Sequence, residues 1–547
     1  MTNALRLSQL ISTFGPGAMV DLPTRSIIVS GLEHWQTQDP QVSQIINEPR
    51  LQSLLERTMR EAGRLDAGQS ITLRTPPVNV DSSGHHQPDG VSAMVFPTLF
   101  VCERNESPTD ASLRRRRLVR WEQLDAGASM HKYRMPDDDR LVAVSPIRFV
   151  GACERGHIED VDWRWAIHRE EDCSRPMFLE ERGTSGSPAD TAIACECGKR
   201  ITLQDTTIVG RLGPCRGRRP WLGRGRHETC QNQLRLLTRS ATNTYFPQVA
   251  TLISLPQGDD ELAKAVDSVW MDLRKIESFE ELKTIVKISS AIGGALSRFN
   301  LERSFKYIQS RQQEETSTAS TSPRVAEFDL LGSGNAIIGN SDRESRLFAV
   351  TLPRETWKDL GKLDLSLIRN VVAIHRLREV TCLYGFTRFE PAPTIEDDIE
   401  EVRLAVSGAP ISETLEWLPA IEQFGEGVFI HFEPSKIAEW FNRVTVKSGG
   451  AALNAGFERW RGESPSRNHL SFPGLPYMAL HTLAHALMIE VALESGYPAS
   501  SIKERIYALQ DRDTEVEFGR FGVLIYTAST GAQGTLGGLV RNSPTPK

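Results

Sequence analysis

Six of the eight cysteines lie between Cys153 and Cys230, and this clustering constrains the fold more than any other feature of the sequence. The cysteine content is too low for a disulfide scaffold, and a reducing compartment keeps cysteines as thiols or metal ligands. Tetrahedral zinc sites are commonly assembled from pairs of such residues that are close in sequence. We therefore predict a zinc-ribbon-like, cysteine-rich region in the N-terminal half of the chain.

The first predicted structural zinc site combines a local pair of cysteines with two later ones. Zinc takes four ligands of this kind, and a local pair lowers the loop entropy of assembling them. The local pair is separated by one residue instead of the usual two, so the alternative is that these side chains are small buried hydrophobes. The ligands of this predicted site are Cys195, Cys197, Cys215 and Cys230.

A second predicted zinc site lies just upstream, where two thiols and two imidazoles have the short-pair, long-loop, short-pair spacing of zinc sites. Trp163 and Trp165 lie inside its loop, so the alternative is core histidines packed on indole rings. The two remaining cysteines, Cys102 and Cys382, stand alone in apolar contexts and are predicted to lie in the core. The ligands of the second site are Cys153, His157, His168 and Cys173.

Arginines are concentrated in the same region, where only Asp205 and Glu228 oppose them between Lys199 and Arg239. Guanidinium groups bind phosphates through paired hydrogen bonds, and an exposed tryptophan stacks on a base. The alternative is a solvated face, or a docking patch for an acidic partner. The predicted nucleic-acid-binding residues are Arg211, Arg216, Arg218, Arg219, Trp221, Arg224, Arg226, Arg235 and Arg239.

A second basic segment is also predicted to bind nucleic acid, with a solvated face or a docking patch for an acidic partner as the alternative. It consists of the run from Arg114 to Arg117, followed by Arg120 and Trp121.

The composition is that of an ordinary globular protein of several domains, with 547 residues, 39% hydrophobic and 24% charged. No apolar stretch approaches the roughly 20 residues of a membrane span, and Gly15-Pro16-Gly17 interrupts the place of an export signal. We therefore expect a cytoplasmic protein without membrane contact. The net charge of -6 gives no global attraction to nucleic acid, so any such attraction must be local.

Helical and strand patterns alternate, which predicts a multidomain α+β fold with a mixed α/β C-terminal domain. Helices are predicted over residues 41–63, 280–309 with an interruption at Gly293-Gly294, 476–494 and 500–510, and strands over 371–374, 428–432 and 523–527. The predicted divisions are an N-terminal α+β domain (1–145), the basic zinc-binding region (146–250), a helical segment (251–311), a linker (312–324) and the C-terminal domain (325–547).

Motifs for motor activity are missing from the sequence. No GxxxxGK[ST] loop occurs, and the glycine-rich segment 531–538 has no lysine and is predicted to be a tight turn. His481 and His485 of HTLAH share one helix face, but Thr482 stands where a metalloprotease has its glutamate. We predict that the chain is not an enzyme. The alternative is a metal-dependent nuclease or hydrolase using these histidines and an unidentified carboxylate.

Several segments together resemble one family, the B subunits (DrmB) of bacterial DISARM anti-phage systems, which carry a helicase-associated domain of unknown function. The likeness extends over nearly the whole chain in matching order. The segments are SQLISTFGPGAMVDLP (8–23), CERGHIEDVDW (153–163), CECG (195–198), SATNTYFP (240–247), HRLREVTCLYGFTRFEP (375–391), HFEP (431–434), HTLAHALM (481–488) and GVLIYTASTGAQGTLGGLV (522–540).

The resemblance implies a non-motor subunit that joins a helicase partner similar to DrmA and helps it to recognise or load on invading, unmodified DNA. The DNA is expected to be single-stranded or to carry an overhang. The family pattern continues past residue 540 into a second cysteine-rich stretch that this sequence lacks, so no terminal cysteine cluster is expected here. The competing interpretation is a structural adaptor without DNA contact, whose arginines face the partner.

Overall fold

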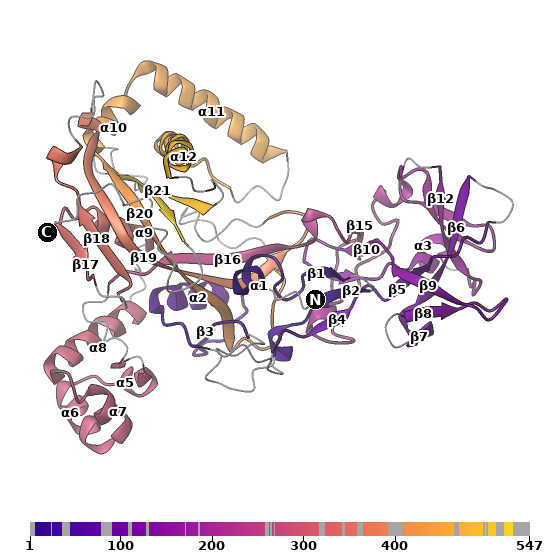
Figure 1. Cartoon of the computed structure of the whole chain (residues 1–547), viewed down its shortest axis with the longest axis horizontal. Coiled ribbons are helices and arrows are strands. Elements are labelled where there is room, and N and C mark those ends of the chain that lie inside the picture. The colour runs from indigo at the N-terminus through magenta and orange to yellow at the C-terminus, as the bar shows by residue number, and fades with distance from the viewer. Residues whose placement is uncertain are drawn as a thin grey trace.

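The computed structural model describes residues 6–528 apart from 23–24, 36–43, 78–89, 108–111, 127–130, 170, 184–185, 257–261, 263–264, 267, 317–322, 342–344, 358–364, 392–407, 464–469, 496–497, 499–500 and 510–518. Figure 1 shows an elongated molecule with a large sheet at one end, a β-rich lobe at the other and a small helical lobe beside the large sheet. Helices and strands are mixed throughout, so the predicted multidomain fold of α and β elements is confirmed.

The C-terminal sheet has the strand order β17-β18-β19-β20-β22-β21. Its long central strands, β19 (Ile368–Thr387) and β20 (Trp417–Phe432), pair antiparallel. β16 (Phe246–Ile253) also pairs with β19, and β3 (Thr72–Arg74) runs parallel to β20. Segments from distant parts of the chain therefore share one sheet. Its other strands are β17 (Ile337–Gly339), β18 (Leu347–Thr351), β21 (Ile502–Leu509) and β22 (Arg520–Thr527).

The N-terminal segment packs against this sheet. Leu10 and Ile11 of α1 (Leu7–Ser12) and Leu51 and Leu55 of α2 (Pro49–Glu61) are buried in one core with Leu383 of β19. A small antiparallel sheet follows α1 and is formed by β1 (Met19–Leu22), β2 (Arg25–Val29) and β4 (Ala93–Val95).

The cysteine-rich region and the strands between Leu99 and Pro146 together form the β-rich lobe, which contains two sheets and the short helix α3 (Trp163–His168). The small sheet has β10 (Phe149–Ala152) between β11 (Ile158–Glu159) and β15 (Arg235–Thr238). The larger sheet runs, in spatial order, through β14 (Arg200–Thr202), β13 (Thr191–Cys195), β12 (Met177–Arg182), β6 (Leu113–Arg120), β5 (Leu99–Cys102), β9 (Leu141–Pro146), β8 (His131–Arg134) and β7 (Leu124–Ala126).

The remaining α-helices of the described residues fall into two groups (Figure 1). The helical lobe contains α5 (Trp270–Leu273), α6 (Phe279–Ile288), α7 (Ser290–Leu296) and α8 (Leu301–Thr316). In the second group, α9 (Pro323–Leu331), α10 (Pro434–Phe441) and α12 (Leu475–Ser495) share cores with the C-terminal sheet, and α11 (Val444–Gly462) contacts α10. Among the described helices, none combines the length and apolar character needed to cross a bilayer.

Most predicted elements are confirmed. The three predicted strands lie within β19, β20 and β22, the predicted helix over 476–494 is α12, and Cys102 and Cys382 are buried core residues. The helix predicted over 41–63 begins only at Pro49, a residue well suited to a first helical position.

Two expectations about local structure are wrong. Residues 500–510 contain strand β21 rather than a helix, because pairing with β22 over eight positions overrides the local helical pattern. The predicted break at Gly293-Gly294 lies inside α7, and the chain instead breaks at Ser289, whose hydroxyl accepts a hydrogen bond from the Ile292 N–H at 3.3 Å.

Two further features lie partly or wholly outside the described residues. The predicted linker begins as helix, since α8 continues to Thr316, and residues 317–322 are among those not described. The glycine-rich segment 531–538 lies outside the described residues.

One buried arginine joins the C-terminal sheet to the cysteine-rich lobe. Arg388, only 2% exposed, donates from Nε to the Gly156 carbonyl at 2.9 Å and from Nη2 to the Gly17 carbonyl at 2.8 Å. Its third nitrogen donates to the Thr244 carbonyl. Burial lowers the pKa of this guanidinium to about 9. A single side chain thus connects three separate segments of backbone.

Replacing this arginine tests that connection. Arg388→Met should lower the midpoint of thermal unfolding by at least about 6 °C, because three buried carbonyls each lose a donor at a cost of roughly 1–3 kcal/mol, and each kcal/mol shifts the midpoint by about 2–4 °C in a unit of 150–250 residues. Differential scanning fluorimetry checks this, with Arg140→Met as the control since the Arg140 side chain is 81% exposed. Equal midpoints for the two variants would contradict the connecting role.

Candidate functional site

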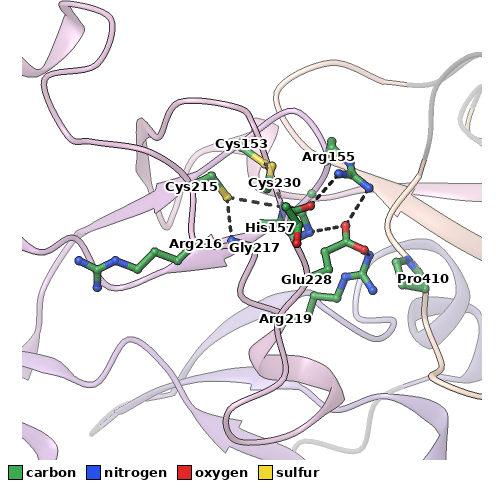
Figure 2. Close-up of polar contacts among 12 residues, drawn as sticks. Cys153, Arg155, His157, Cys215, Arg216, Gly217, Arg219, Glu228, Cys230 and Pro410 are labelled. Carbon is green, nitrogen blue, oxygen red and sulfur yellow. Dashed lines mark hydrogen bonds and ion pairs between the residues drawn. The ribbon is translucent and has the colours of Figure 1, made fainter.

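Four predicted ligands from the cysteine-rich region converge in a first cluster. Their ligand atoms all lie within 4.8 Å of one another, and Figure 2 shows the side chains pointing toward a common centre. Three of the four residues are buried, and the fourth, Cys230, is partly buried. The members of the first cluster are Cys153, His157, Cys215 and Cys230.

A tight turn after β10 places the first two members. The Cys153 N–H donates to the His157 carbonyl at 3.1 Å, and the Gly156 N–H donates to the Cys153 carbonyl at 3.0 Å. Gly156 has a φ of +81°, and a Cβ there would lie 2.6 Å from the Ala409 Cβ. The turn therefore requires glycine for both its conformation and its close contact with the C-terminal segment.

The distances within the first cluster fit a tetrahedral metal site. Ligand atoms about 2.3 Å from a central zinc lie about 3.8 Å apart. The Cys153 and Cys230 Sγ atoms are 3.9 Å apart, and His157 Nδ1 lies 3.3 Å from Cys153 Sγ and 3.6 Å from Cys215 Sγ. Three thiols and one imidazole are a donor set found in structural zinc sites. This cluster could hold a metal ion.

Glu228 fixes which nitrogen of His157 faces the thiols. His157 Nε2 lies 2.8 Å from Glu228 Oε1, so the protonated Nε2 donates to the carboxylate and leaves the Nδ1 lone pair for a metal. Glu228 also forms ion pairs with Arg155, at 2.9 Å, and with Arg219 (Figure 2). In the sequence, Glu228 stands out only as a charge that opposes the arginines, and its position two residues before Cys230 is the signal that could have identified it.

The protonation of the thiols indicates a buried negative charge. A hydrogen bond from Cys215 lowers the pKa of the Cys153 thiol to about 4 against the opposing effect of burial. The same contact, with burial, raises the pKa of Cys215. The Gly217 N–H donates to Cys215 Sγ at 3.3 Å, which opposes this rise in the pKa of Cys215. A divalent cation at the centre would neutralise this charge.

A second cluster lies in the larger sheet of the same lobe, where β13 ends and α3 ends. Its ligand atoms also lie within 4.8 Å of one another, and the Sγ atoms of Cys173 and Cys195 are 3.6 Å apart. His168 is buried, and its Nε2 has no hydrogen-bond partner among the described residues, as expected for a nitrogen that binds a metal. The members of the second cluster are His168, Cys173, Cys195 and Cys197.

The eight predicted ligands therefore form two clusters, but the predicted grouping is wrong. The second cluster is nested in sequence between the two halves of the first. The reason is the pairing of β10 with β15, which brings the loop containing Cys215 and Cys230 back to the turn after β10. Most of the residues between them form the β12–β13–β14 hairpins, which share a hydrophobic core with Cys153 and Cys215.

Five of the eight predicted phosphate-binding arginines are exposed, and four of these five are ion-paired. Apart from Glu228, which pairs with Arg219, the partners come from outside the run, which explains why the local sequence shows few opposing charges. The pairs are Arg216–Asp162 at 2.8 Å, Arg218–Glu159 at 3.9 Å, Arg226–Glu413 at 2.9 Å, Arg235–Glu154 at 3.2 Å and Arg239–Asp21 at 3.2 Å. Arg211, Arg219 and Arg239 are only partly exposed, whereas Arg224 is exposed.

Trp221 cannot be the predicted stacking platform, because its side chain is 0% exposed. Its Nε1–H donates to the Pro410 carbonyl at 2.8 Å, and its ring packs edge-on against Phe386 at 5.2 Å between centroids. Trp221 is a core residue at the contact between the lobe and the C-terminal sheet.

Four of the exposed arginines surround one surface cavity of about 580 Å³. The cavity lies beside β4 and is also lined by Arg120 and by Trp121, which is partly exposed. The carboxylates of Glu159, Asp160 and Asp162 lie in the same wall, and burial raises the pKa of Glu159 and Asp160. We call this cavity the arginine groove, and its arginines from the predicted set are Arg216, Arg218, Arg224 and Arg226.

The second basic segment is mainly structural. Arg114 to Arg117 lie on β6, where all four pair with glutamates of neighbouring segments, including Arg116 with Glu181 at 2.8 Å and Arg117 with Glu106 at 2.8 Å. The interpretation of this run as a face paired with acidic neighbours is therefore the one that the structure favours.

Comparison with known proteins agrees with the resemblance. The DISARM protein DrmB of Bacillus paralicheniformis is 28% identical to this chain over 464 residues, covering 82% of this chain and 76% of that protein. This chain is therefore similar to DrmB over most of its length. Residues 6–246 also match a family model described as a domain of unknown function (DUF8724). That match contains both metal-ligand clusters and the arginine groove.

Removing the charge of Glu228 tests its role beside the first cluster. Glu228→Gln should weaken metal binding about 10–100-fold, because the carboxylate orients His157 and raises the basicity of its ring. Competition with a chromophoric chelator measures the affinity. Glu154→Gln is the matched control, since Glu154 is 70% exposed and pairs with Arg235 instead of a ligand. Equal affinities in the two variants would contradict the assignment.

Proposed function

We propose that this chain is a non-motor subunit of a cytoplasmic anti-phage DNA-restriction complex, in which it binds DNA and a helicase partner. The main support is the likeness to DrmB, a DISARM protein, over 82% of the chain. The sequence contains no GxxxxGK[ST] loop, so an ATP-driven step requires another subunit. In this proposal the chain helps the helicase to recognise or load on invading, unmodified DNA.

The two clusters bind zinc ions with a structural role in this proposal. Each supplies four protein ligands, which leaves no open coordination position for a substrate. The first cluster is also buried, since Cys153 and His157 are 0% exposed. Zinc binding here contributes folding free energy and holds the arginine-bearing loop between Cys215 and Cys230 in place.

The arginine groove and the exposed Arg235 supply the DNA contacts in this proposal. Phosphates compete with the carboxylate partners of these arginines, and exposed ion pairs are weak enough to exchange. Trp121 is a partly exposed aromatic side chain in the groove, and stacking of a base on its ring favours single-stranded DNA or an overhang. Arg211, Arg219, Arg239 and Trp221 support the loop rather than contacting DNA.

Salt dependence of DNA binding tests the groove. Arg218→Ala with Arg224→Ala should lower the magnitude of the slope of log K against log salt by about 1.4 for single strands, because each lost phosphate contact removes about 0.7. Fluorescence anisotropy with single-stranded and overhang DNA at several salt concentrations measures this. The control is Arg134→Ala with Arg140→Ala, which removes two exposed arginines on the hairpin of β8 and β9.

An unchanged slope in the groove variant would rule out phosphate contacts there. If that variant instead lost the co-encoded helicase subunit in a pull-down while its remaining DNA affinity kept its salt dependence, the adaptor interpretation would replace the DNA-binding one. A pull-down in which the unmodified chain failed to retain the helicase would contradict the partner itself.

A further inference from the structure

A third group of metal-ligating side chains lies far from the cysteines, on α12 and β21. His481 and His485 are one turn apart on α12, with ring centroids 4.5 Å apart and ring planes at 89°. Glu504 of β21 reaches both, since its Oε1 lies 2.9 Å from His481 Nδ1 and 3.3 Å from His485 Nε2. The ligand atoms of all three residues lie within 4.8 Å of one another.

The packing of α12 on the sheet produces this convergence. Leu480 and Ala484 are buried in a core shared with Ile506 of β21, which fixes the helix on the strand. His481 and His485 directly follow these two residues in sequence, so they lie at the edge of the contact on one helix face. Tyr477 stacks on His481 with ring planes at 15°, which limits rotation of that imidazole.

Hydrogen bonding does not satisfy this group. His481 Nδ1 and Glu504 Oε2 are buried atoms without a hydrogen-bond partner among the described residues. The 2.9 Å contact between His481 and Glu504 therefore brings two atoms together without the angle of a hydrogen bond. Unpaired buried polar atoms cost free energy, and a shared cation would satisfy the imidazole nitrogens and the carboxylate at once.

We propose that His481, His485 and Glu504 form a third metal site, which binds a divalent transition metal ion such as Zn²⁺ or Co²⁺. Two imidazoles and one carboxylate suit these ions, whereas an oxygen-only site would suit Mg²⁺ or Ca²⁺. Three protein ligands leave coordination positions open, and the exposed fractions of the His481 and His485 side chains, 42% and 59%, let solvent reach them. The open positions accept water or an anionic oxygen ligand.

The third site differs from the two cysteine clusters in accessibility and in donor chemistry. Its metal exchanges with solvent ions, because it is open and has no thiolate ligand, while the metals of the clusters are enclosed by four ligands each. Glu504 acts here as a ligand, and Thr482 occupies the position of the metalloprotease glutamate. The site is independent of the proposed DNA contacts.

Metal content of the full chain tests the third site. The chain is incubated with Zn²⁺, freed of excess ion by gel filtration, and analysed for zinc per folded chain. His485→Ala and Glu504→Gln should each bind one zinc fewer than the unmodified chain, and Thr482→Ala, an exposed residue of the same helix turn, should bind the full amount. Because the His485 side chain is 59% exposed, its truncation leaves the core of α12 intact.

A second readout separates this site from the clusters. Co²⁺ added to the zinc-loaded chain after brief treatment with a chelator should give visible absorption without a sulfur-to-metal charge-transfer band, and His485→Ala should abolish that absorption. Equal zinc content in all four proteins, or a cobalt spectrum that persists in His485→Ala, would overturn the proposal. Loss of zinc from the cysteine clusters would change the total content but not the difference between these variants.

Discussion

The hydrogen bond between His157 and Glu228 is the interaction on which the cysteine-rich lobe depends. It fixes the imidazole with Nδ1 toward the thiols and holds the loop before Cys230 against the turn after β10. Through the ion pairs of Glu228, the same contact holds Arg155 and Arg219 in place. One carboxylate therefore organises both the first cluster and two arginines.

The position of the lobe relative to the C-terminal sheet follows from the same turn. Its Gly156 carbonyl accepts a hydrogen bond from Arg388, which begins the segment after β19, and Gly156 itself packs against Ala409. Trp221, from the loop between Cys215 and Cys230, is buried against Phe386 of β19. The metal-ligand turn and loop thus form the contact between the two parts of the molecule, so loss of metal there is expected to affect more than the lobe.

The residue types of the candidate site could be predicted from the sequence, but their spatial grouping could not. Cysteines and histidines at zinc-like spacing predicted all eight members of the clusters. Their order along the chain suggested successive sites, whereas the pairing of β10 with β15 nests one site inside the other.

The burial of individual side chains could not be predicted from the sequence either. Trp221 lies in a basic loop and was predicted to stack on a base, but its side chain is buried in the core. Strand β21 was not predicted, because it forms by pairing with β22, and this pairing is not encoded in the local sequence. For the same reason, Glu504 on β21 was not identified as a candidate metal ligand.

Zinc counting in paired cysteine variants tests the nested arrangement most directly. Cys153→Ser with Cys215→Ser removes two ligands from the first cluster alone, so the chain should lose one zinc. Cys195→Ser with Cys215→Ser removes one ligand from each cluster and should lose two. The successive grouping predicts the reverse, with two zinc ions lost in the first variant and one in the second. That reversed result, measured by elemental analysis on folded protein, would contradict the nested arrangement of the two clusters.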